Sequence, residues 1–392
     1  NVDDEIGKKG TEERLHELLR ETIRDFFARE LPEETIREYD RNRKFPRELW
    51  KRFAELGWMA LPVPEQFGGT DADVMTAAIL TEEMGRRFAS IAVDWVLVSM
   101  DARLIAEVGT PAQQEDLLPR IAAGEYLMAF GMSEPDGGTD VLGLKTRADL
   151  EGGEWVIRGQ KLYTSMADDS DAILVLCRTD EPVDGKRARG LSLVITPRHQ
   201  DAIQVRRLEL MGMRAAGTTE VFLDGARAPE DAILGERGRG FYHLIATLDN
   251  ERILAAAISL GIAGAALDEA LRYAKERTAF GRPIGGFQAL QHLLADTASE
   301  VEQARLALMK AAWLQSQGRE CSTESAIAKL ACSEAAIRAT DRGLRILAGY
   351  GLVEESPMER YFRDARLGAF SPISNEMLKN FVGERLGLPK SY

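Results

Sequence analysis

The hydrophobic pattern along these 392 residues predicts a multidomain α+β protein. Three observations lead to this prediction. Helical apolar spacing fills the first third of the chain, short segments with turn residues between them follow, and helical spacing then returns. We expect an N-terminal α-helical domain (1–127), a central antiparallel β-barrel or sandwich (128–238) and a C-terminal four-helix bundle (239–392).

The first domain is predicted to be helical because apolar residues recur every three or four positions. This spacing is present in 12–30 and 46–56, and it resumes from residue 71 to about 108. Pro111 follows at a position that suits the first turn of another helix, where a missing N–H has no consequence.

The central region changes period. Five short segments rich in β-branched and apolar residues are separated by clusters of Gly, Pro and Asp, which are typical of turns. So many short strands within about 100 residues favour a small barrel or sandwich. The expected strands are Trp155–Lys161, Ala172–Cys177, Leu191–Thr196, Ile203–Leu208 and Thr219–Leu223.

The C-terminal region is expected to form a bundle because long helical patterns cover about 240–275, 287–317 and 321–349. Before it, residues 235–240 contain three glycines but no βαβ unit surrounds them. We therefore interpret this segment as a linker and not as a dinucleotide-binding turn. The most apolar stretch, 253–267, is short and rich in Ala and Gly, so it predicts a buried core helix and no integral membrane segment.

Composition narrows the function classes. The formal net charge is −13 and no long basic run occurs, which argues against a nucleic-acid-binding surface. The three cysteines are widely spaced and the four histidines form no ligand set, so we expect neither a disulfide framework nor a metal site. The acidic, polar N-terminus predicts no signal peptide, and together with the cysteines it favours a cytoplasmic location.

Three segments carry candidate chemistry. Residues 131–143 form a Gly-rich turn with many backbone N–H groups, although a plain connection between domains would look alike. Residues 277–284 place two arginines and an aromatic residue between two helices, which fits diphosphate binding or an ordinary helix connection. A Gly-rich loop at 348–352 precedes a cationic cluster at 360–366, which fits a phosphate or a subunit contact.

Glu251 is the strongest candidate catalytic residue. It stands in line with an apolar helical stripe that continues through Leu254, Ile258, Gly261 and Ala265. Burial of a carboxylate is costly unless the group is paired or used, and burial raises its pKa toward the range of a general base. The alternative is a solvated glutamate in the first turn of a helix, where it would stabilise the helix dipole.

Together these segments resemble the acyl-CoA dehydrogenase family over essentially the whole chain. Further matches are the segments 109–113, 118–120 and Asn250-Glu251-Arg252. The resemblance implies that FAD binds between domains and across a subunit interface, in a homotetramer or homodimer. It also implies an acyl-CoA or acyl-carrier-protein thioester as substrate and an electron-transfer flavoprotein as the electron acceptor.

The same resemblance assigns roles to individual residues. The expected FAD contacts are Phe130, Met132, Ser133, Gly138, Thr139, Tyr163, Ser165, Arg277, Phe280, Gln288, Arg345, Gly349, Ser374 and Glu376. Among them Arg277, Phe280 and Gln288 are expected to contact the FAD of a neighbouring subunit. The expected substrate contacts are Ser133, Thr139, Asp249 and Arg252.

Several positions depart from the family pattern. Tyr163 and Ser165 stand where Trp and Thr are usual, and they keep an aromatic face and a hydroxyl. Arg345 and Ala348 replace the usual Gln and Gly of the loop near the FAD pyrophosphate, so the FAD contacts of that loop differ from the pattern.

The usual position of the catalytic glutamate, counted from Arg363-Asp364-Ala365, holds Pro372. Isovaleryl-CoA-type members carry the base on the long helix instead, at the position of Glu251, which we therefore expect to be the base. Glu376 is the nearest rival. Proline has no N–H, whereas the family uses a backbone N–H at this position to bind the thioester carbonyl, and loss of such a donor typically costs about 2.7–4 kcal/mol of transition-state stabilisation. Three explanations stay open: the loop is shifted by one residue, another donor substitutes, or the reaction differs.

The implied reaction is α,β-dehydrogenation of the thioester to a trans-2-enoyl product. Glu251 would remove the α-proton and flavin N5 would accept the β-hydride. The altered loop at Pro372 leaves two alternatives. One is a relative with other flavin chemistry, such as a monooxygenase, a nitroalkane oxidase or a thioester desulfinase. The other is a paralogue that binds FAD and an acyl thioester without catalysis.

Overall fold

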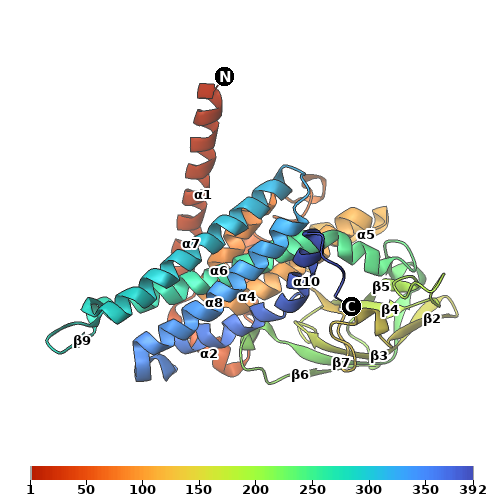
Figure 1. Cartoon of the computed structure of the whole chain (residues 1–392). Coiled ribbons are helices and arrows are strands. Elements are labelled where there is room, and N and C mark those ends of the chain that lie inside the picture. The colour runs from red at the N-terminus through yellow and green to blue at the C-terminus, as the bar shows by residue number, and fades with distance from the viewer. Residues whose placement is uncertain (1, 392) are drawn as a thin grey trace.

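The computed structural model describes residues 2–391, with side-chain surroundings from residue 14 onward. A helical region comes first, a sheet follows at one side, and a second helical region completes the molecule (Figure 1). The helices of the first and last regions pack together, while the sheet lies beside them. The predicted order of helical, β and helical parts is thus confirmed.

The N-terminal region is helical as predicted. One helix, at 33–42, was missed because its residues are mostly charged and its apolar face is narrow. The helix from Val74 is interrupted at Phe88, and its second half carries the residues that matter for the site. The helices of this region are α1 (Val2–Glu30), α2 (Glu33–Asn42), α3 (Arg47–Glu55), α4 (Val74–Val108) and α5 (Pro111–Ala122).

The central sheet has eight strands: seven follow an open path from β6 to β8, and β1 pairs with β4 beside that path. Most pairs are antiparallel as expected. It is nevertheless a mixed sheet, because β1 runs parallel to β4 and the end of β2 also meets β4 in parallel. This corrects the expectation of a wholly antiparallel barrel or sandwich. The strands are β1 (Met128–Gly131), β2 (Arg147–Glu151), β3 (Glu154–Thr164), β4 (Ala172–Arg178), β5 (Leu191–Pro197), β6 (Ile203–Arg207), β7 (Thr219–Pro229) and β8 (Ile233–Leu234).

Three long helices dominate the C-terminal region, within a residue or two of the predicted spans. A short hairpin between the first two extends away from the body of the molecule (Figure 1). The elements are α6 (Gly240–Glu276), β9 (Thr278–Ala279), β10 (Arg282–Pro283), α7 (Gln288–Ser316), α8 (Ser322–Leu347), α9 (Pro357–Asp364) and α10 (Asn375–Arg385).

The crossing of α4 and α6 forms the centre of the fold and positions the site. Gly85 and Gly261 let the two backbones approach closely. A Cβ at Gly85 would lie 2.6 Å from the carbonyl oxygen of Ile258, and a Cβ at Gly261 would lie 2.1 Å from that of Glu82. Neither distance is tolerable for a side chain, so both glycines are required by packing. Beyond this crossing, α4 and α6 line a cavity together.

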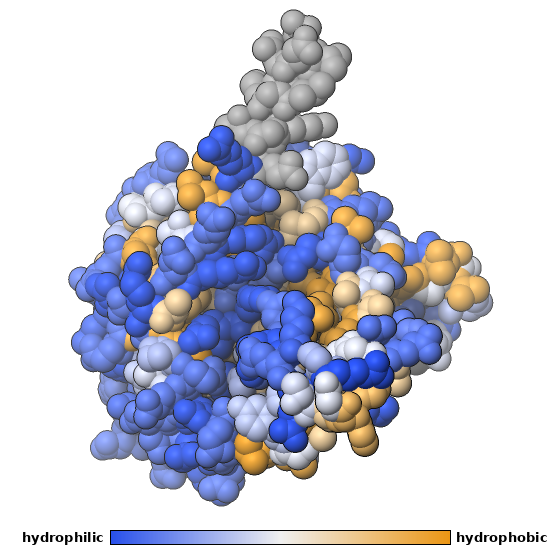
Figure 2. All heavy atoms as spheres, turned by 90° about the vertical axis from the view of Figure 1, so that its left-hand side faces the viewer, coloured by the Kyte–Doolittle hydropathy of each residue, from blue (hydrophilic) through white to orange (hydrophobic). Residues whose placement is uncertain are grey.

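α6 is long and apolar enough to cross a membrane by length and composition, but 78% of its most apolar window is buried inside the protein. It is therefore a core helix here. The face of the molecule on the side of the β9–β10 hairpin is largely hydrophilic, with separate apolar patches (Figure 2). The large apolar surface of α6 is thus used within the fold.

Candidate active site

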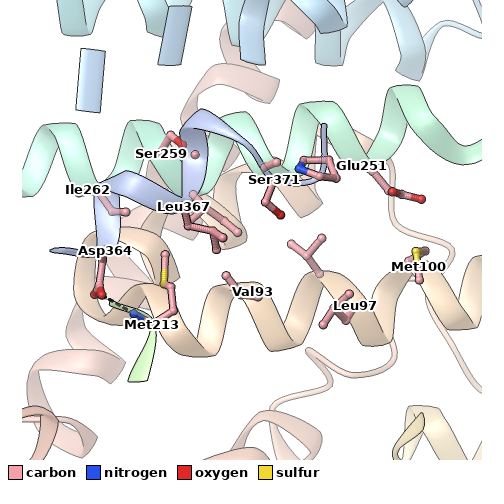
Figure 3. Close-up of a pocket in the computed structure, with 15 residues that line it drawn as sticks. Val93, Leu97, Met100, Met213, Glu251, Ser259, Ile262, Asp364, Leu367 and Ser371 are labelled. Carbon is pink, nitrogen blue, oxygen red and sulfur yellow. Dashed lines mark hydrogen bonds between the residues drawn. The ribbon is translucent and has the colours of Figure 1, made fainter. Parts of the chain in front are cut away.

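The candidate site is a cavity of about 100 Å³ between α4, α6 and the segment that follows α9. Most side chains around it are apolar, including Val93, Leu97 and Met100 from α4 (Figure 3). Glu251 stands at one end and Asp364 at the other, with Ser371 on the wall near Glu251, and Pro372 also lines the cavity. The cavity therefore offers an apolar channel with a carboxyl group at each end.

Glu251 lies on α6 and lines the cavity, while the stripe that continues from it is buried in the core as predicted. Its Oε1 accepts a hydrogen bond from the Thr247 hydroxyl, one turn earlier, at 2.8 Å. Burial raises the pKa of Glu251 to about 7, and the Thr247 hydrogen bond and the Arg252 charge offset only part of this rise. A carboxyl group with a pKa near neutrality is suited to taking a proton.

The Thr247 hydroxyl can serve both protonation states of Glu251. It lies 2.9 Å from the Leu244 carbonyl oxygen as well as 2.8 Å from Glu251. A hydroxyl has one proton to donate and lone pairs to accept. It can donate to the ionised carboxylate, or donate to Leu244 while it accepts from the protonated carboxyl. The partner of Glu251 therefore does not fix its protonation state.

Asp364 closes the far end of the cavity. Its Oδ1 accepts a hydrogen bond of 2.7 Å from the backbone N–H of Met213, which joins the C-terminal region to the β-domain. Burial raises the pKa of Asp364 to about 6, against the lowering effects of that N–H and of the neighbouring arginines Arg363 and Arg360. This carboxyl group is thus oriented by the backbone.

Asp249 and Arg252, the predicted substrate contacts on α6, are engaged within the protein. Arg252 is buried, lies 3.3 Å from the Asp249 carboxylate and packs over the Phe381 ring of α10. The Asp249 carboxylate also accepts hydrogen bonds from the hydroxyls of Ser322 and Ser325. These contacts tie the α6 turn that carries Glu251 to α8 and α10; a substrate role for the two residues stays a prediction.

The predicted flavin contacts of the β-domain gather where β1 and β3 end. Phe130 is on β1, Met132 and Ser133 follow it, and the Ser133 carbonyl accepts a hydrogen bond of 2.8 Å from the Leu162 N–H at the end of β3. The Tyr163 side chain is 63% exposed and its backbone adopts φ 58°, a region that large residues rarely occupy.

Ser165 lies just after Tyr163, and its hydroxyl is 3.2 Å from that of Thr218. Gly138 and Thr139 are exposed in the turn that follows β1. An exposed aromatic ring in an uncommon backbone conformation, near hydroxyl groups, fits a flat polar aromatic ligand such as the FAD ring.

Five other predicted flavin contacts do not line the cavity that contains Glu251. Phe280 is 95% exposed on the β9–β10 hairpin, and Arg277 and Gln288 beside it are exposed as well. Arg345 and Gly349 are exposed at the end of α8, where Arg345 pairs with Asp341 at 3.0 Å. One chain therefore does not bring these residues to the cavity.

Two predicted flavin contacts flank the start of α10. The Ser374 hydroxyl accepts a hydrogen bond from the Met377 N–H and caps the helix, while Glu376 is exposed in its first turn. Pro372 lines the cavity. Sequence reasoning missed Thr247 and Asp364; the spacing of Thr247 and Glu251, four residues apart on one helix face, was the available signal for the first.

An α–β–α chain with a carboxyl group of raised pKa beside an apolar cavity has the features of an enzyme that removes a proton from an apolar substrate. Residues 13–125, 129–226 and 238–387 match the models of the N-terminal, middle and C-terminal domains of acyl-CoA dehydrogenases. The chain belongs to the acyl-CoA dehydrogenase family, whose members are FAD-dependent oxidoreductases.

Individual relatives cover nearly the whole chain. The mitochondrial short-chain specific acyl-CoA dehydrogenase of Bos taurus is 37% identical over 95% of this chain and 90% of its own length. The glutaryl-coenzyme A dehydrogenase structure with glutaryl-CoA has a TM-score of 0.90 at 33% identity, with 96% of each chain covered. Butyryl-CoA dehydrogenase from Megasphaera elsdenii has a TM-score of 0.89 at 31% identity, with 95% of this chain and 98% of that chain covered.

Proposed function

We propose that this protein dehydrogenates a short, uncharged acyl-CoA thioester at its α,β bond, with Glu251 as the base that removes the α-proton. The observation that carries the proposal is the position of Glu251 at one end of an apolar cavity, with a pKa raised to about 7 and a single hydroxyl partner. Near neutral pH such a group is partly ionised and can accept a proton.

The chain's own residues hold and orient the reactants. The apolar wall from α4 and α6 excludes water from the acyl chain, and the Thr247 hydroxyl orients the Glu251 carboxylate. Ser133, Tyr163 and Ser165 would hold the FAD ring, together with Phe130 and Met132. When bound, FAD supplies the acceptor for the two electrons that leave with the β-hydrogen.

The size and polarity of the cavity favour a short acyl chain. Its volume of about 100 Å³ is smaller than the roughly 150 Å³ of an apolar cavity that accommodates benzene. No lysine or arginine lies among the described residues that line it, and Asp364 closes its far end. A terminal carboxylate like that of glutaryl-CoA would meet the Asp364 carboxyl group, with no cationic side chain among the described lining residues to pair with it, which is unfavourable.

The remaining assignments follow the family resemblance. We infer a homotetramer or homodimer, because Phe280, Arg277 and Gln288 form an exposed group that is suited to an FAD bound by another subunit. An electron-transfer flavoprotein is the inferred electron acceptor. A cytoplasmic location agrees with Cys177, Cys321 and Cys332, which are all free thiols.

Anaerobic flavin absorbance tests the proposal. The FAD-loaded protein would be mixed with butyryl-, isobutyryl-, isovaleryl-, octanoyl- and glutaryl-CoA, and Glu251→Gln, Glu376→Gln and Glu48→Gln would be compared with the natural chain. We expect fast bleaching by the short uncharged thioesters, lost in Glu251→Gln and kept in the surface control Glu48→Gln. Bleaching lost only in Glu376→Gln would move the base to that residue. A flavin that no thioester bleaches would favour other flavin chemistry or a non-catalytic paralogue.

A further inference from the structure

A buried lysine contacts the cavity wall from behind. The segment from Gly368 to Ser374, here called the wall, contributes Gly368, Ser371 and Pro372 to the lining of the cavity, and the Ser371 side chain points into the cavity (Figure 3). Lys329 of α8 lies on the other side of this segment. Its side chain is 1% exposed, and its Nζ donates to the Ile373 carbonyl oxygen at 2.8 Å and to Asn375 Oδ1 at 2.7 Å.

The two acceptors of Lys329 stand on either side of Ser374. One belongs to the wall, and the other belongs to the first residue of α10. Asn375 is itself buried, and its amide donates to the Ser333 hydroxyl and to the Glu334 carboxylate at 3.1 and 3.0 Å. A single ammonium group thus joins the end of the wall to a polar network on α8.

The other end of the wall is fixed by close packing. A Cβ at Gly368 would lie 2.8 Å from the Ser259 hydroxyl and 3.1 Å from Cβ of Ser333. Side chains of α6 and α8 therefore hold the beginning of the wall, and Lys329 holds its end. Ser371 and Pro372, which line the cavity, lie between these two points in the chain.

A buried ammonium group is an expensive way to fill space, since desolvation penalises the charge and a side chain such as Met would avoid that penalty. No carboxylate among the described residues lies within ion-pair distance of Lys329; its partners are a backbone carbonyl and an amide. The hydrogen bonds of a charged donor are about twice as strong as neutral ones. The hydrogen bonds of Lys329 therefore stabilise the position of the wall.

We propose that Lys329 is a positioning residue for the dehydrogenation, whose ammonium group holds the end of the wall against α8 and so sets the distance between the wall and Glu251. The inference rests on the proposed function, because the wall matters only if Glu251 is the reacting group. Displacement of a positioning group by about 1 Å can slow a reaction on the order of 100-fold.

Protonation of Lys329 gives the proposal a signature in pH. Burial lowers the pKa of Lys329 from its ordinary 10.5 to about 8, although the carboxylates that face it, Glu376 on α10 and Glu334 on α8, raise it. Above pH 8 the lysine loses its charge and its hold on the wall weakens. Between pH 8 and 10.5 the native state binds fewer protons here than the unfolded chain, so the contribution of Lys329 to global stability rises with pH. Above pH 8 the wall should loosen while the contribution of Lys329 to global stability rises, so an experiment can distinguish loosening of the wall from unfolding of the protein.

Hydrogen–deuterium exchange of the 370–377 segment tests the proposal on the FAD-loaded protein. The variants are Lys329→Met and the exposed control Lys51→Met on α3. We expect protection of this segment to fall about tenfold or more in Lys329→Met, with other regions and the thermal midpoint nearly unchanged. In the natural chain its protection should also fall above pH 8, and Lys329→Met should lose that pH dependence. Unchanged protection in Lys329→Met would overturn the proposal.

Flavin bleaching on the same preparations separates the two proposals. A thioester that bleaches the natural chain should bleach Lys329→Met roughly 10- to 100-fold more slowly, while Lys329→Gln, which keeps a donor, should regain part of the rate. Equal rates in Lys329→Met and the natural chain would refute the positioning role. If no thioester bleaches the natural chain, the proposed function fails, and the exchange result still decides whether Lys329 holds the wall. Should Lys329→Met not fold, Ser333→Ala, which removes one member of the network, must show a smaller loss of protection in the same segment.

Discussion

Glu251 and Asp364 occupy opposite ends of one cavity, and burial raises the pKa of both, to about 7 and about 6. Their partners differ. Asp364 accepts a backbone N–H, a fixed donor that favours the ionised form and holds the carboxylate in one orientation. Among the described residues, the hydrogen-bond partner of the Glu251 carboxyl is the rotatable Thr247 hydroxyl. Burial alone therefore does not identify the base. The hydrogen-bond partner distinguishes the two carboxyl groups: the hydroxyl beside Glu251 allows proton exchange, whereas the backbone N–H beside Asp364 favours a structural role.

The substitution Glu251→Gln tests most directly whether Glu251, unlike Asp364, is the base. A general base contributes about 10²–10⁴-fold, so flavin bleaching by butyryl-CoA should slow by that factor in a stopped-flow experiment. In the natural chain the rate should rise as pH rises through about 7, because only ionised Glu251 takes a proton. An equal loss in Glu48→Gln would contradict the assignment.

The stability of the protein should change in the opposite direction. The raised pKa of Glu251 means that its stabilising contribution is fully present below about pH 4.5 and is lost as pH rises through 7. Glu251→Gln removes this dependence and should be at least as stable as the natural chain at pH 8. A lower thermal midpoint at that pH would assign Glu251 a structural role instead.

Asp364→Ala tests the other end. The Met213 N–H loses its acceptor, and a buried unsatisfied donor costs about 1–3 kcal/mol, measured as a lower thermal midpoint. Asp364→Asn keeps an oxygen acceptor and should lose less. If Asp364→Ala kept its stability but lost bleaching as completely as Glu251→Gln, the structural interpretation of Asp364 would be wrong.

Leu97→Ala changes the space between the two ends. The cavity gains room for added methylene groups, each worth about 1–3 kcal/mol of discrimination in such a pocket. The ratio of kcat/KM for hexanoyl- over butyryl-CoA should rise roughly tenfold. A ratio that stays constant would indicate that the acyl chain lies elsewhere.

The smallest effect is expected from Thr247→Val, which removes the hydroxyl beside Glu251 and keeps the branched shape. A net hydrogen bond of about 0.5–1.5 kcal/mol corresponds to a shift of up to roughly one pH unit. The pH at which bleaching reaches half its maximum should therefore move upward. A downward shift would show that Thr247 favours the protonated form of Glu251.

Periodicity predicted most of the fold. The long helices α4, α6, α7 and α8 were found because their apolar faces repeat over many turns. α2 was missed because it is short and mostly charged. The parallel pairing of β1 with β4 depends on contacts between segments more than 40 residues apart, which a local pattern does not contain.

The site divides in the same way. Glu251 was predicted because a carboxylate in an apolar stripe is visible in the sequence, and the structure shows that it lines the cavity; its role as the base stays a prediction. Asp364 and Lys329 were not predicted, because their partners are the Met213 N–H and the Ile373 carbonyl. These backbone groups reach the two side chains only when the chain folds. Backbone donors and acceptors are present at nearly every residue, so sequence alone does not single them out.

Glu251 is on a rigid helix, whereas Pro372 is in a connecting segment. This division has a practical consequence for protein engineering. Under the proposed function, a library of substitutions at Ser371 and Pro372 would vary the cavity wall that the thioester meets, while the proposed base would remain on α6. Such a library would measure how far the shape of the wall can change before flavin bleaching slows, while the Glu251 side chain itself stays unaltered.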